Sequence, residues 1–289
     1  MRFAFLLLMV VPAAFGHTGE AVHSRFSVKE NADVDTLLRV SSELSNDCGK
    51  WCLLMANRRA HGKDPRKFTL SIDNGRRAGF CKLCGLMHLE VNGYLSRDLQ
   101  LNRNCVREYA DGERKGVEFS LNFDGVVMRT RFWMRPGSPR LWAEVCRSGK
   151  SLEPVADVKV GLTALPSFLE VMNGKSRFDG YRRSVRTASR CVKPCKRASV
   201  PIRTDDHYFI FQDEDYDGSA IDKGVGPVAV FLEADCKGCV RLNDGWLTDL
   251  CLTPNPKKPL RFSLLEYPEE RVSNDEFERR VRREELNRE

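Results

Sequence analysis

Short runs of strand-forming residues, separated by tight-turn dipeptides, constrain the fold of this chain more than any other feature. The runs Phe68–Ile72, Leu86–Val91 and Val117–Phe123 are each followed closely by Asn-Gly or Asp-Gly. These dipeptides favour the left-handed backbone conformations of two-residue hairpin turns, so the flanking runs are expected to pair as antiparallel strands. The pattern predicts a mainly β protein.

Residues 117–165 carry this pattern most clearly. Four strand-like runs follow one another there with turn residues between them, and they predict an antiparallel meander. Apolar and polar residues alternate imperfectly along the second run, which indicates that both faces are partly covered. We therefore predict an antiparallel β-sandwich. The four runs are Val117–Phe123, Val126–Met134, Leu141–Cys146 and Val155–Leu165, and further strands are expected at His207–Gln212, Pro227–Glu233, Val240–Leu242, Trp246–Leu252 and Arg261–Tyr267.

The two ends of the chain are expected to be helical. A patch around Val34–Leu44, followed by Trp51–Met55, predicts a small helical N-terminal region at residues 17–65. Ser273, with Glu276 three residues later, forms a capping box, which predicts a C-terminal helix at about 273–287 that covers a sheet edge. Residues 66–289 are then one β-sandwich domain with this helix at its end.

Residues 1–16 are interpreted as a signal peptide. Arg2 precedes an uninterrupted apolar run from Phe3 to Phe15, and Ala14 and Gly16 are the small residues that a signal peptidase requires, so cleavage is expected after Gly16. The run is shorter than the roughly 20 residues of a membrane-spanning helix. An uncleaved anchor is the alternative. We predict an extracytoplasmic protein (secreted, periplasmic or in the cell envelope) with no transmembrane segment after the signal is removed.

The chain has 11 cysteines, all after the signal, and four close pairs among them. An oxidising compartment favours disulfides, and the odd number leaves at least one thiol unpaired. Three interpretations stay open: local disulfides within the close pairs, a zinc cluster of Cys81, Cys84, Cys236 and Cys239, or thiols that act in redox chemistry or link partners. The close pairs are Cys48/Cys52, Cys81/Cys84, Cys191/Cys195 and Cys236/Cys239.

The segment Asp213–Ser219 has the D-x-D-x-D-G spacing with which a calcium loop begins. Alternate carboxylates in a tight turn converge on one hard cation, so calcium is the predicted cofactor. The twelfth position holds Gly224 in place of the bidentate glutamate, and a solvated acidic hairpin is the alternative. The predicted metal ligands are Asp213, Asp215, Asp217, Ser219 and Asp222.

A basic segment lies between Lys175 and Arg203, with ten Lys or Arg against the single acid Asp179. Outside the cytoplasm such a segment favours a sulfated or uronic-acid glycan or a membrane surface over nucleic acid, and a solvated loop is the alternative. Among the tryptophans, Trp133, Trp142 and Trp246 are candidates for stacking on sugar rings, with burial in the core as the alternative. The predicted binding residues are Arg182, Arg183, Arg186, Arg190 and Trp246.

His207 is the candidate catalytic residue. It lies among carboxylates at the start of an expected strand and could transfer a proton with Glu233 or Asp213 as its partner. A surface histidine is the alternative. Motifs of serine hydrolases, zinc proteases, P-loop proteins and dinucleotide-binding proteins are absent from the sequence.

Two stretches resemble exported bacterial proteins with a galactose-mutarotase-like β-supersandwich. They are Asn122–Gly125 with the following strands and the Pro136–Pro139 turn, and His207–Phe209 with its strand. The resemblance implies a carbohydrate-associated fold in which a histidine and a glutamate on strands act on sugars, and only His207 matches. It favours an exported carbohydrate-recognition protein. The alternatives are a glycan-processing enzyme (epimerase or lyase) and a disulfide-linked envelope structural protein, and the oligomeric state stays open.

Overall fold

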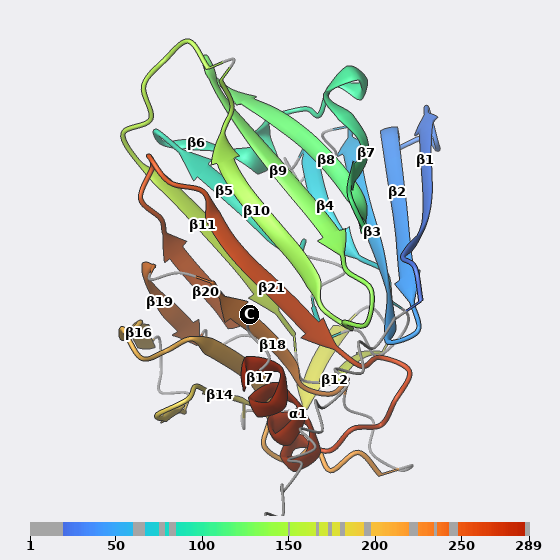
Figure 1. The fold of residues 1–289 in the computed structure, drawn as a ribbon. Helices are drawn as coiled ribbons and strands as arrows, with labels where there is room; N and C mark the ends of the chain where they lie inside the picture. The colour runs from blue at the N-terminus through green and yellow to red at the C-terminus, as the bar shows by residue number, and fades with distance from the viewer. Residues whose placement is uncertain are drawn as a thin grey trace, which may run out of the picture.

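The computed structural model describes most of the chain. The described residues are 20–59, 67–74, 79–80, 85–149, 151–165, 168–172, 175–179, 183–193, 198–219, 225–233, 236–242 and 248–286. They form a nine-stranded, a six-stranded and a four-stranded sheet, a two-stranded ribbon and a C-terminal helix (Figure 1). All strand pairs are antiparallel, which confirms the predicted mainly β sandwich.

The nine-stranded sheet forms one layer. In spatial order its strands are β15 (Cys191–Val192), β14 (Arg183–Arg186), β17 (Tyr208–Asp213), β18 (Val228–Leu232), β21 (Leu260–Glu266), β10 (Leu141–Arg147), β9 (Val126–Met134), β8 (Arg114–Phe123) and β7 (Val106–Asp111).

The other two sheets form the opposing layer. The six-stranded sheet contains β16 (Ala198–Pro201), β19 (Lys237–Leu242), β20 (Thr248–Thr253), β11 (Val158–Ala164), β5 (Met87–Val91) and β6 (Tyr94–Leu95). The four-stranded sheet contains β1 (His23–Glu30), β2 (Thr36–Asn46), β3 (Gly49–Arg58) and β4 (Phe68–Ile72). The ribbon is β12 (Phe168–Met172) and β13 (Lys175–Asp179), and two short 3-10 helices lie at Ser96–Asp98 and Arg103–Cys105.

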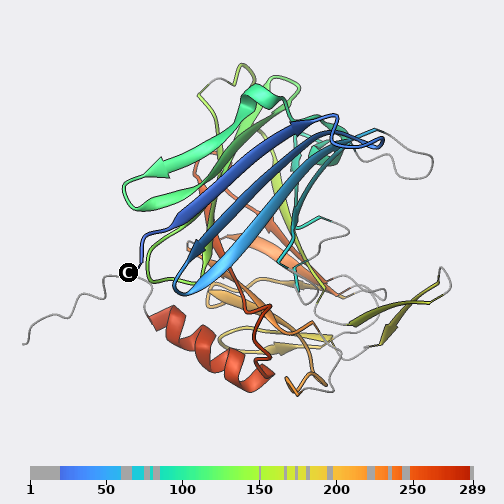
Figure 2. The ribbon, with the colours of Figure 1, turned by 90° about the vertical axis from the view of Figure 1, so that its right-hand side faces the viewer.

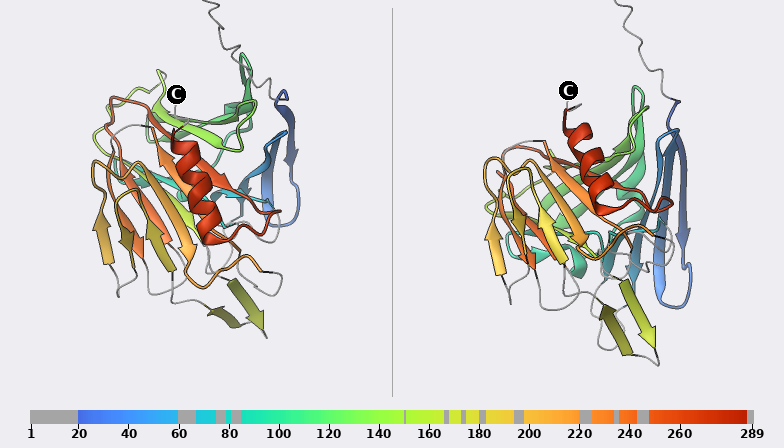
Figure 3. Two further views of the ribbon diagram at one scale, coloured as in Figure 1. Left: turned by 60° about the horizontal axis from the view of Figure 1, so that its bottom comes forward. Right: turned by 90° about the horizontal axis from the view of Figure 1, so that it is seen from below.

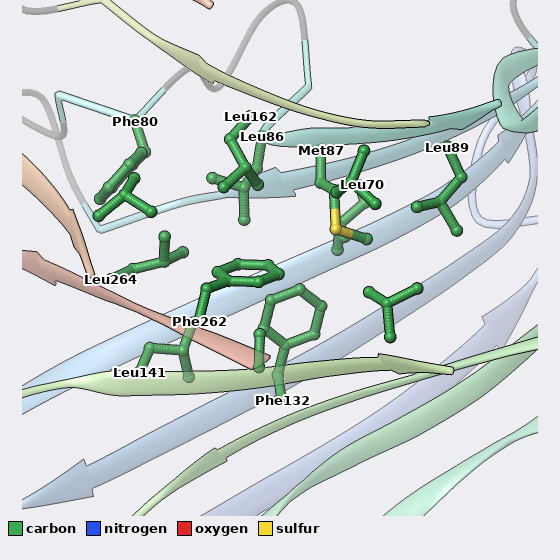
Figure 4. Packing of buried hydrophobic residues seen from close by; sticks show 14 of the residues in the cluster. Leu70, Phe80, Leu86, Met87, Leu89, Phe132, Leu141, Leu162, Phe262 and Leu264 are labelled. Atoms are coloured by element: carbon green, nitrogen blue, oxygen red, sulfur yellow. The ribbon is translucent and has the colours of Figure 1, made fainter. Parts of the chain in front are cut away.

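One hydrophobic core joins the three sheets. The backbone N–H of Leu86 donates to the carbonyl of Leu70, so β4 continues into the layer that contains β5. On the other side, β1 and β2 contact β8 (Figure 2). Figure 4 shows Phe132 and Phe262 of the nine-stranded sheet pointing toward Met87 across this core. Burial of these apolar side chains is the main force that holds the layers together.

The predicted helical N-terminal region is wrong, because residues 23–58 form three strands. Leu38, Val40, Ser42 and Leu44 alternate with more exposed residues at a period of two, and this face lies in the core. The residues that interrupt the expected helix, 46–49, are the hairpin turn between β2 and β3. The four-stranded sheet includes strands from both sides of the predicted boundary at residue 65.

The predicted meander is confirmed for its first three strands, since β8, β9 and β10 pair in that order. The fourth run, β11, crosses to the other layer and pairs with β5 and β20, while β21 takes the place beside β10. At the turns, Asn92, Gly93, Asp124 and Gly125 all have positive φ, which is the conformation expected of Asn-Gly and Asp-Gly hairpins.

The predicted C-terminal helix is confirmed as α1 (Asn274–Leu286), and Ser273 Oγ accepts a hydrogen bond from the Glu276 N–H at 3.3 Å. Its expected position was wrong in one respect: α1 lies on the outer face of the nine-stranded sheet and not along an edge (Figure 3). Phe277 and Val281 pack there against Ile210 and Phe231. Among the described residues, no helix has the length and apolar character needed to cross a membrane.

Candidate functional site

A cleft of about 510 Å³ lies where the β2–β3 hairpin meets the end of β21. Its wall comes from five separate parts of the chain: the hairpin, the end of β4, the turn between β9 and β10, the last residue of β21, and the segment that leads to α1. Its lining residues include Asp47, Lys50, Trp51, Asp73, Asn74, Glu266, Tyr267, Glu269 and Glu270.

The β2–β3 hairpin is held against the turn between β9 and β10. The Asn46 side-chain amide donates to the carbonyls of Arg135 at 2.7 Å and Ser138 at 2.8 Å, and its oxygen accepts from the backbone N–H groups of Cys48 and Gly49. Trp51 Nε1 donates to the Pro139 carbonyl at 2.8 Å. These bonds fix one wall of the cleft, so its shape is set before any ligand arrives.

Glu266 lines this cleft and is the most unusual ionisable group near it. Its side chain is buried, Oε1 accepts from Asn74 Nδ2 at 2.6 Å, and Oε2 accepts from the Phe80 N–H at 3.5 Å. Burial raises the pKa of Glu266 to about 7, against the opposing effect of the hydrogen bonds from Asn74 and from the backbone of Phe80 and Gly79. A carboxyl group with this pKa exchanges a proton near neutral pH, as general acids and bases do.

The cleft is acidic. Asp47, Asp73, Glu269 and Glu270 contribute carboxyl groups beside Glu266, and among the described lining residues Lys50 is the one basic residue. Carboxylate oxygens accept hydrogen bonds, and the amide of Asn74 both donates and accepts them. Sequence reasoning missed this site, although Glu266 follows the apolar pair Leu264–Leu265 in a strand; a charged residue in such a run was the available signal.

His207 lies at a second cleft of about 630 Å³, on a different part of the molecule. Its ring is exposed, and Arg203, Asp206, Cys236 and Lys237 line the same cleft. Asp206 is buried and accepts from Arg190 at 2.5 Å and from the Arg203 N–H at 2.9 Å. Burial opposes ionisation of Asp206, but its bonds with Thr187, Arg203 and Arg190 prevail and lower its pKa. The catalytic role of His207 stays a prediction.

The structure does not place His207 beside Asp213 or Glu266. His207 precedes β17 and Asp213 ends it, so roughly 20 Å of extended strand separate the two. The Leu232 N–H donates to the His207 carbonyl, and Leu232 lies opposite Phe262. Glu266 is four residues farther along β21, about 13 Å away along the strand. Asp213 was therefore the wrong partner for His207. Glu233, the other predicted partner, is adjacent to Leu232 at the same end of the sheet, so it stays a predicted partner.

The predicted calcium residues make turn hydrogen bonds. Asp213 Oδ1 accepts from the Asp215 N–H at 3.1 Å, and Asp217 Oδ1 accepts from the Ser219 N–H at 2.7 Å. The Arg271 guanidinium bonds the carbonyl of Ser219, which is the seventh-position ligand of a calcium loop. Asp222 lies outside the described residues, and the residues that are described contain no group of three or more His, Cys, Asp or Glu arranged for a metal ion. Calcium stays a prediction.

The predicted glycan-binding arginines make contacts within the protein. Arg183 is buried, Arg186 pairs with Glu278 of α1 at 2.9 Å, and Arg190 pairs with Asp206. Arg182 and Trp246 lie outside the described residues. These contacts link β14 and its surroundings to α1 and to the second cleft, and the binding role of this segment stays a prediction.

The other two candidate tryptophans lie opposite each other on β9 and β10. Trp133 is 5% exposed and Trp142 is 8% exposed, and Arg135 lies over the Trp142 ring at 4.0 Å. The covered ring of Trp142 offers no free face to a sugar, and Trp133 is nearly inaccessible. Both side chains are therefore buried, as the alternative interpretation expected.

Eight of the 11 cysteines are described, and all eight are free thiols. Cys81, Cys84 and Cys195 lie outside the described residues, so the zinc interpretation stays untested, as does a disulfide within two of the close pairs. Cys48 lies at the first cleft, where burial and the neighbouring Asp47 raise its pKa to about 11. Cys48 is therefore a neutral thiol at physiological pH.

Comparison with known proteins gives only a distant likeness. No family model and no curated protein matches the chain. Two solved structures of the alpha-N-acetylgalactosaminidase NagBb from Bifidobacterium bifidum, a quadruple mutant and a GalNAc complex, are similar to it with a TM-score of 0.44 each. The sequence identities are 12% and 13%, and the matches cover 88% and 86% of this chain. The chain spans 36% of the length of each, and we draw no functional conclusion from this likeness.

Proposed function

We propose that the protein binds carbohydrate outside the cytoplasm, with the ligand in the Glu266 cleft. The apolar run Phe3–Phe15 supports export. The observation that carries the binding proposal is the lining of the cleft, in which carboxylates and an amide surround a buried carboxyl group. A sugar presents several hydroxyl groups that each donate and accept hydrogen bonds, and such a lining matches them.

The charge of the cleft narrows the class of ligand. Asp47, Asp73 and Glu269 near Glu266 disfavour a sulfated or uronic-acid glycan and favour an uncharged sugar or an amino sugar, whereas the charge of Glu270 is offset by its pair with Arg280. Binding of an anionic glycan would require the basic segment between Lys175 and Arg203, and calcium at Asp213–Asp222 would act there as a structural ion. Anionic-glycan binding and calcium binding remain separate proposals, because no described residue of either segment lines this cleft.

A glycan array tests the binding proposal, with the mature chain as wild type, Asp73→Asn and Asp98→Asn. Asp73 lines the cleft, and Asp98 is an exposed carboxylate outside it. We expect binding of neutral or amino glycans, at least tenfold weaker for Asp73→Asn and unchanged for Asp98→Asn. Repeating the array with calcium and with EDTA, at two salt concentrations, separates the acidic cleft from the two other proposals. No binding, or equal binding by all three proteins, would overturn the proposal.

A glycan-processing enzyme is the second candidate, and the raised pKa of Glu266 favours it. In such an enzyme Glu266 would donate or accept the proton while the neighbouring carboxylates hold the sugar. Glu266→Gln would then abolish turnover of any glycan that the array identifies and leave its binding within about threefold. A variant that turns over the sugar at the wild-type rate would exclude this role.

A further inference from the structure

Two cysteines that are 12 positions apart lie side by side on the outer face of the six-stranded sheet. Cys239 of β19 is directly opposite Cys251 of β20, in a register that runs without interruption from Lys237/Thr253 to Leu242/Thr248. Directly opposite residues of antiparallel strands have Cα atoms about 4.5–5.5 Å apart. Disulfides span Cα distances of about 4.4–6.8 Å, so this pair meets the distance requirement without movement of the backbone.

The thiols of this pair also influence each other. The Cys251 thiol interacts electrostatically with the Cys239 thiol, and the Arg241 guanidinium interacts with both cysteines. Both cysteines are partly exposed. The neighbouring Gly238 allows the two strands this close approach, since a Cβ there would lie 2.1 Å from the Cys251 carbonyl oxygen.

The pairing that sequence spacing predicted for Cys239 is less favourable. Cys236 precedes β19 and is three residues from Cys239. Three extended residues span about 10 Å, beyond the reach of a disulfide. Cys236 Sγ donates instead to the carbonyl of Lys237 at 3.3 Å and lines the second cleft. The two cysteines of this C-x-x-C unit therefore have different surroundings.

We propose that Cys239 and Cys251, which are free thiols in this structure, form a disulfide on oxidation that links β19 to β20. The proposal rests on the proposed export of the chain into an oxidising compartment, and not on glycan binding. The thiolate of Cys239 attacks a sulfur of oxidised glutathione and releases one glutathione thiolate, which takes up a proton. The thiolate of Cys251 then attacks the mixed disulfide and releases the second glutathione. The two thiols lose two protons and two electrons, and the oxidised glutathione gains them.

This link would stabilise the second cleft. Cys239 is two residues from Lys237, and Cys251 is two residues from Thr253; these neighbours are opposite each other and line that cleft together. A covalent bond two residues inside the wall holds the ends of β19 and β20 together. The wall around His207 then keeps its shape when the strand ends fray.

Trypsin separates the three relevant cysteines, so peptide mapping distinguishes their pairings. Cleavage after Lys223, Lys237, Arg241 and Lys257 places Cys236 in residues 224–237, Cys239 in residues 238–241 and Cys251 in residues 242–257. The purified mature chain is incubated with reduced and oxidised glutathione, free thiols are alkylated in acid and urea, and the digest is analysed without reductant. We expect one dominant cross-linked species that joins residues 238–241 to residues 242–257.

Serine variants provide a second readout. Cys251→Ser should lose this species and melt roughly 5 °C or more below the oxidised wild type, because the unfolded chain is no longer constrained by the link. Cys236→Ser is the matched control and should keep both the cross-linked species and the melting temperature. A dominant link between residues 224–237 and 238–241, or alkylation of Cys239 and Cys251 in the presence of oxidised glutathione, would overturn the proposal. Failure of glycan binding leaves this map unchanged, so the two proposals fail separately.

Discussion

Asn74 Nδ2 donates a hydrogen bond of 2.6 Å to Glu266 Oε1, although 192 positions separate the two residues. The oxygen of the same amide accepts from the Cys52 N–H at 2.6 Å. One side chain thus joins β3 of the four-stranded sheet to β21 of the nine-stranded sheet. This amide therefore links the two layers directly at the acidic cleft.

Replacement of Asn74 by alanine removes both bonds and leaves the buried carboxyl of Glu266 without its nearest donor. We expect the free energy of unfolding to fall by about 2–3 kcal/mol in urea denaturation. The control is Asn104→Ala, which replaces an exposed residue of the short 3-10 helix Arg103–Cys105 and should change stability by less than about 0.5 kcal/mol. Equal effects of the two substitutions would contradict the bridging role of Asn74.

Stability should depend on the protonation of Glu266. Its pKa is raised from 4.5 to about 7, because burial penalises the charged form. The folded protein therefore holds this proton more tightly than the unfolded chain, and its contribution to stability is complete below about pH 4.5. As pH rises to about 7 that contribution is lost, at most about 3 kcal/mol, and above pH 7 the curve levels off.

The measurement compares the free energy of unfolding of the wild type and Glu266→Gln from pH 4.5 to 8. The difference between the two isolates Glu266 from the other titrating groups, since glutamine does not ionise. We expect the wild type to lose stability relative to the variant across this range. Parallel pH curves for the two proteins would show that Glu266 ionises normally.

A row of alternating charges crosses the outer face of the nine-stranded sheet, and Glu118 is its most buried carboxylate. Arg131 Nε lies 2.5 Å from Glu118 Oε2, and Arg107 lies 2.7 Å from Oε1. Burial raises the pKa of Glu118, but the hydrogen bonds from Arg131 and Arg107 outweigh burial and hold it below its usual range. Glu118→Gln should therefore destabilise the fold by roughly 2–3 kcal/mol in denaturant unfolding.

Glu43→Gln is the matched control for Glu118→Gln, because both side chains of the ion pair between Glu43 and Lys50 are exposed to solvent. Surface ion pairs contribute less than about 1 kcal/mol, and raising the salt concentration should weaken that effect further. A larger loss of unfolding free energy for the Glu43 variant than for the Glu118 variant would contradict the structural importance of this row of charges.

Gly116 of β8 is required by the close approach of β9. A Cβ atom at this position would lie 1.8 Å from the Phe132 carbonyl oxygen, and a backbone atom cannot move aside as a side chain can. Gly116→Ala should therefore lower the melting temperature strongly, with a loss of about 3 kcal/mol or more. Gly149→Ala, where nothing lies within 4 Å of the added Cβ, should be close to neutral in the same thermal scan.

Local sequence predicted the elements whose conformation depends on neighbouring residues. Asn92-Gly93 and Asp124-Gly125 adopt left-handed turns because these residues tolerate positive φ at low cost. The capping residue Ser273 marks the start of α1 for a similar reason, since its hydroxyl accepts the N–H of Glu276. Such signals lie within a few residues of the element they specify.

The N-terminal strands show where local reasoning failed. Val34, Leu37, Leu38 and Leu44 fit a helical face about as well as Leu38, Val40 and Leu44 fit a strand face. The cross-strand partners in β1 and β3, and the core against β8, select the strand. A short amphipathic segment does not carry that information by itself.

The amino-acid sequence alone determined that this protein is mainly β, that its hairpins turn at Asn-Gly and Asp-Gly, and that a capped helix follows the last strand. The tertiary structure decided where that helix packs, which strand lies beside β10, and how Glu266, Asn74 and the β2–β3 hairpin form one cleft. The physical reason is the distance along the chain over which each kind of interaction acts. Turn and cap preferences act through adjacent residues, whereas the burial and pKa of Glu266 depend on groups that only the folded core brings together.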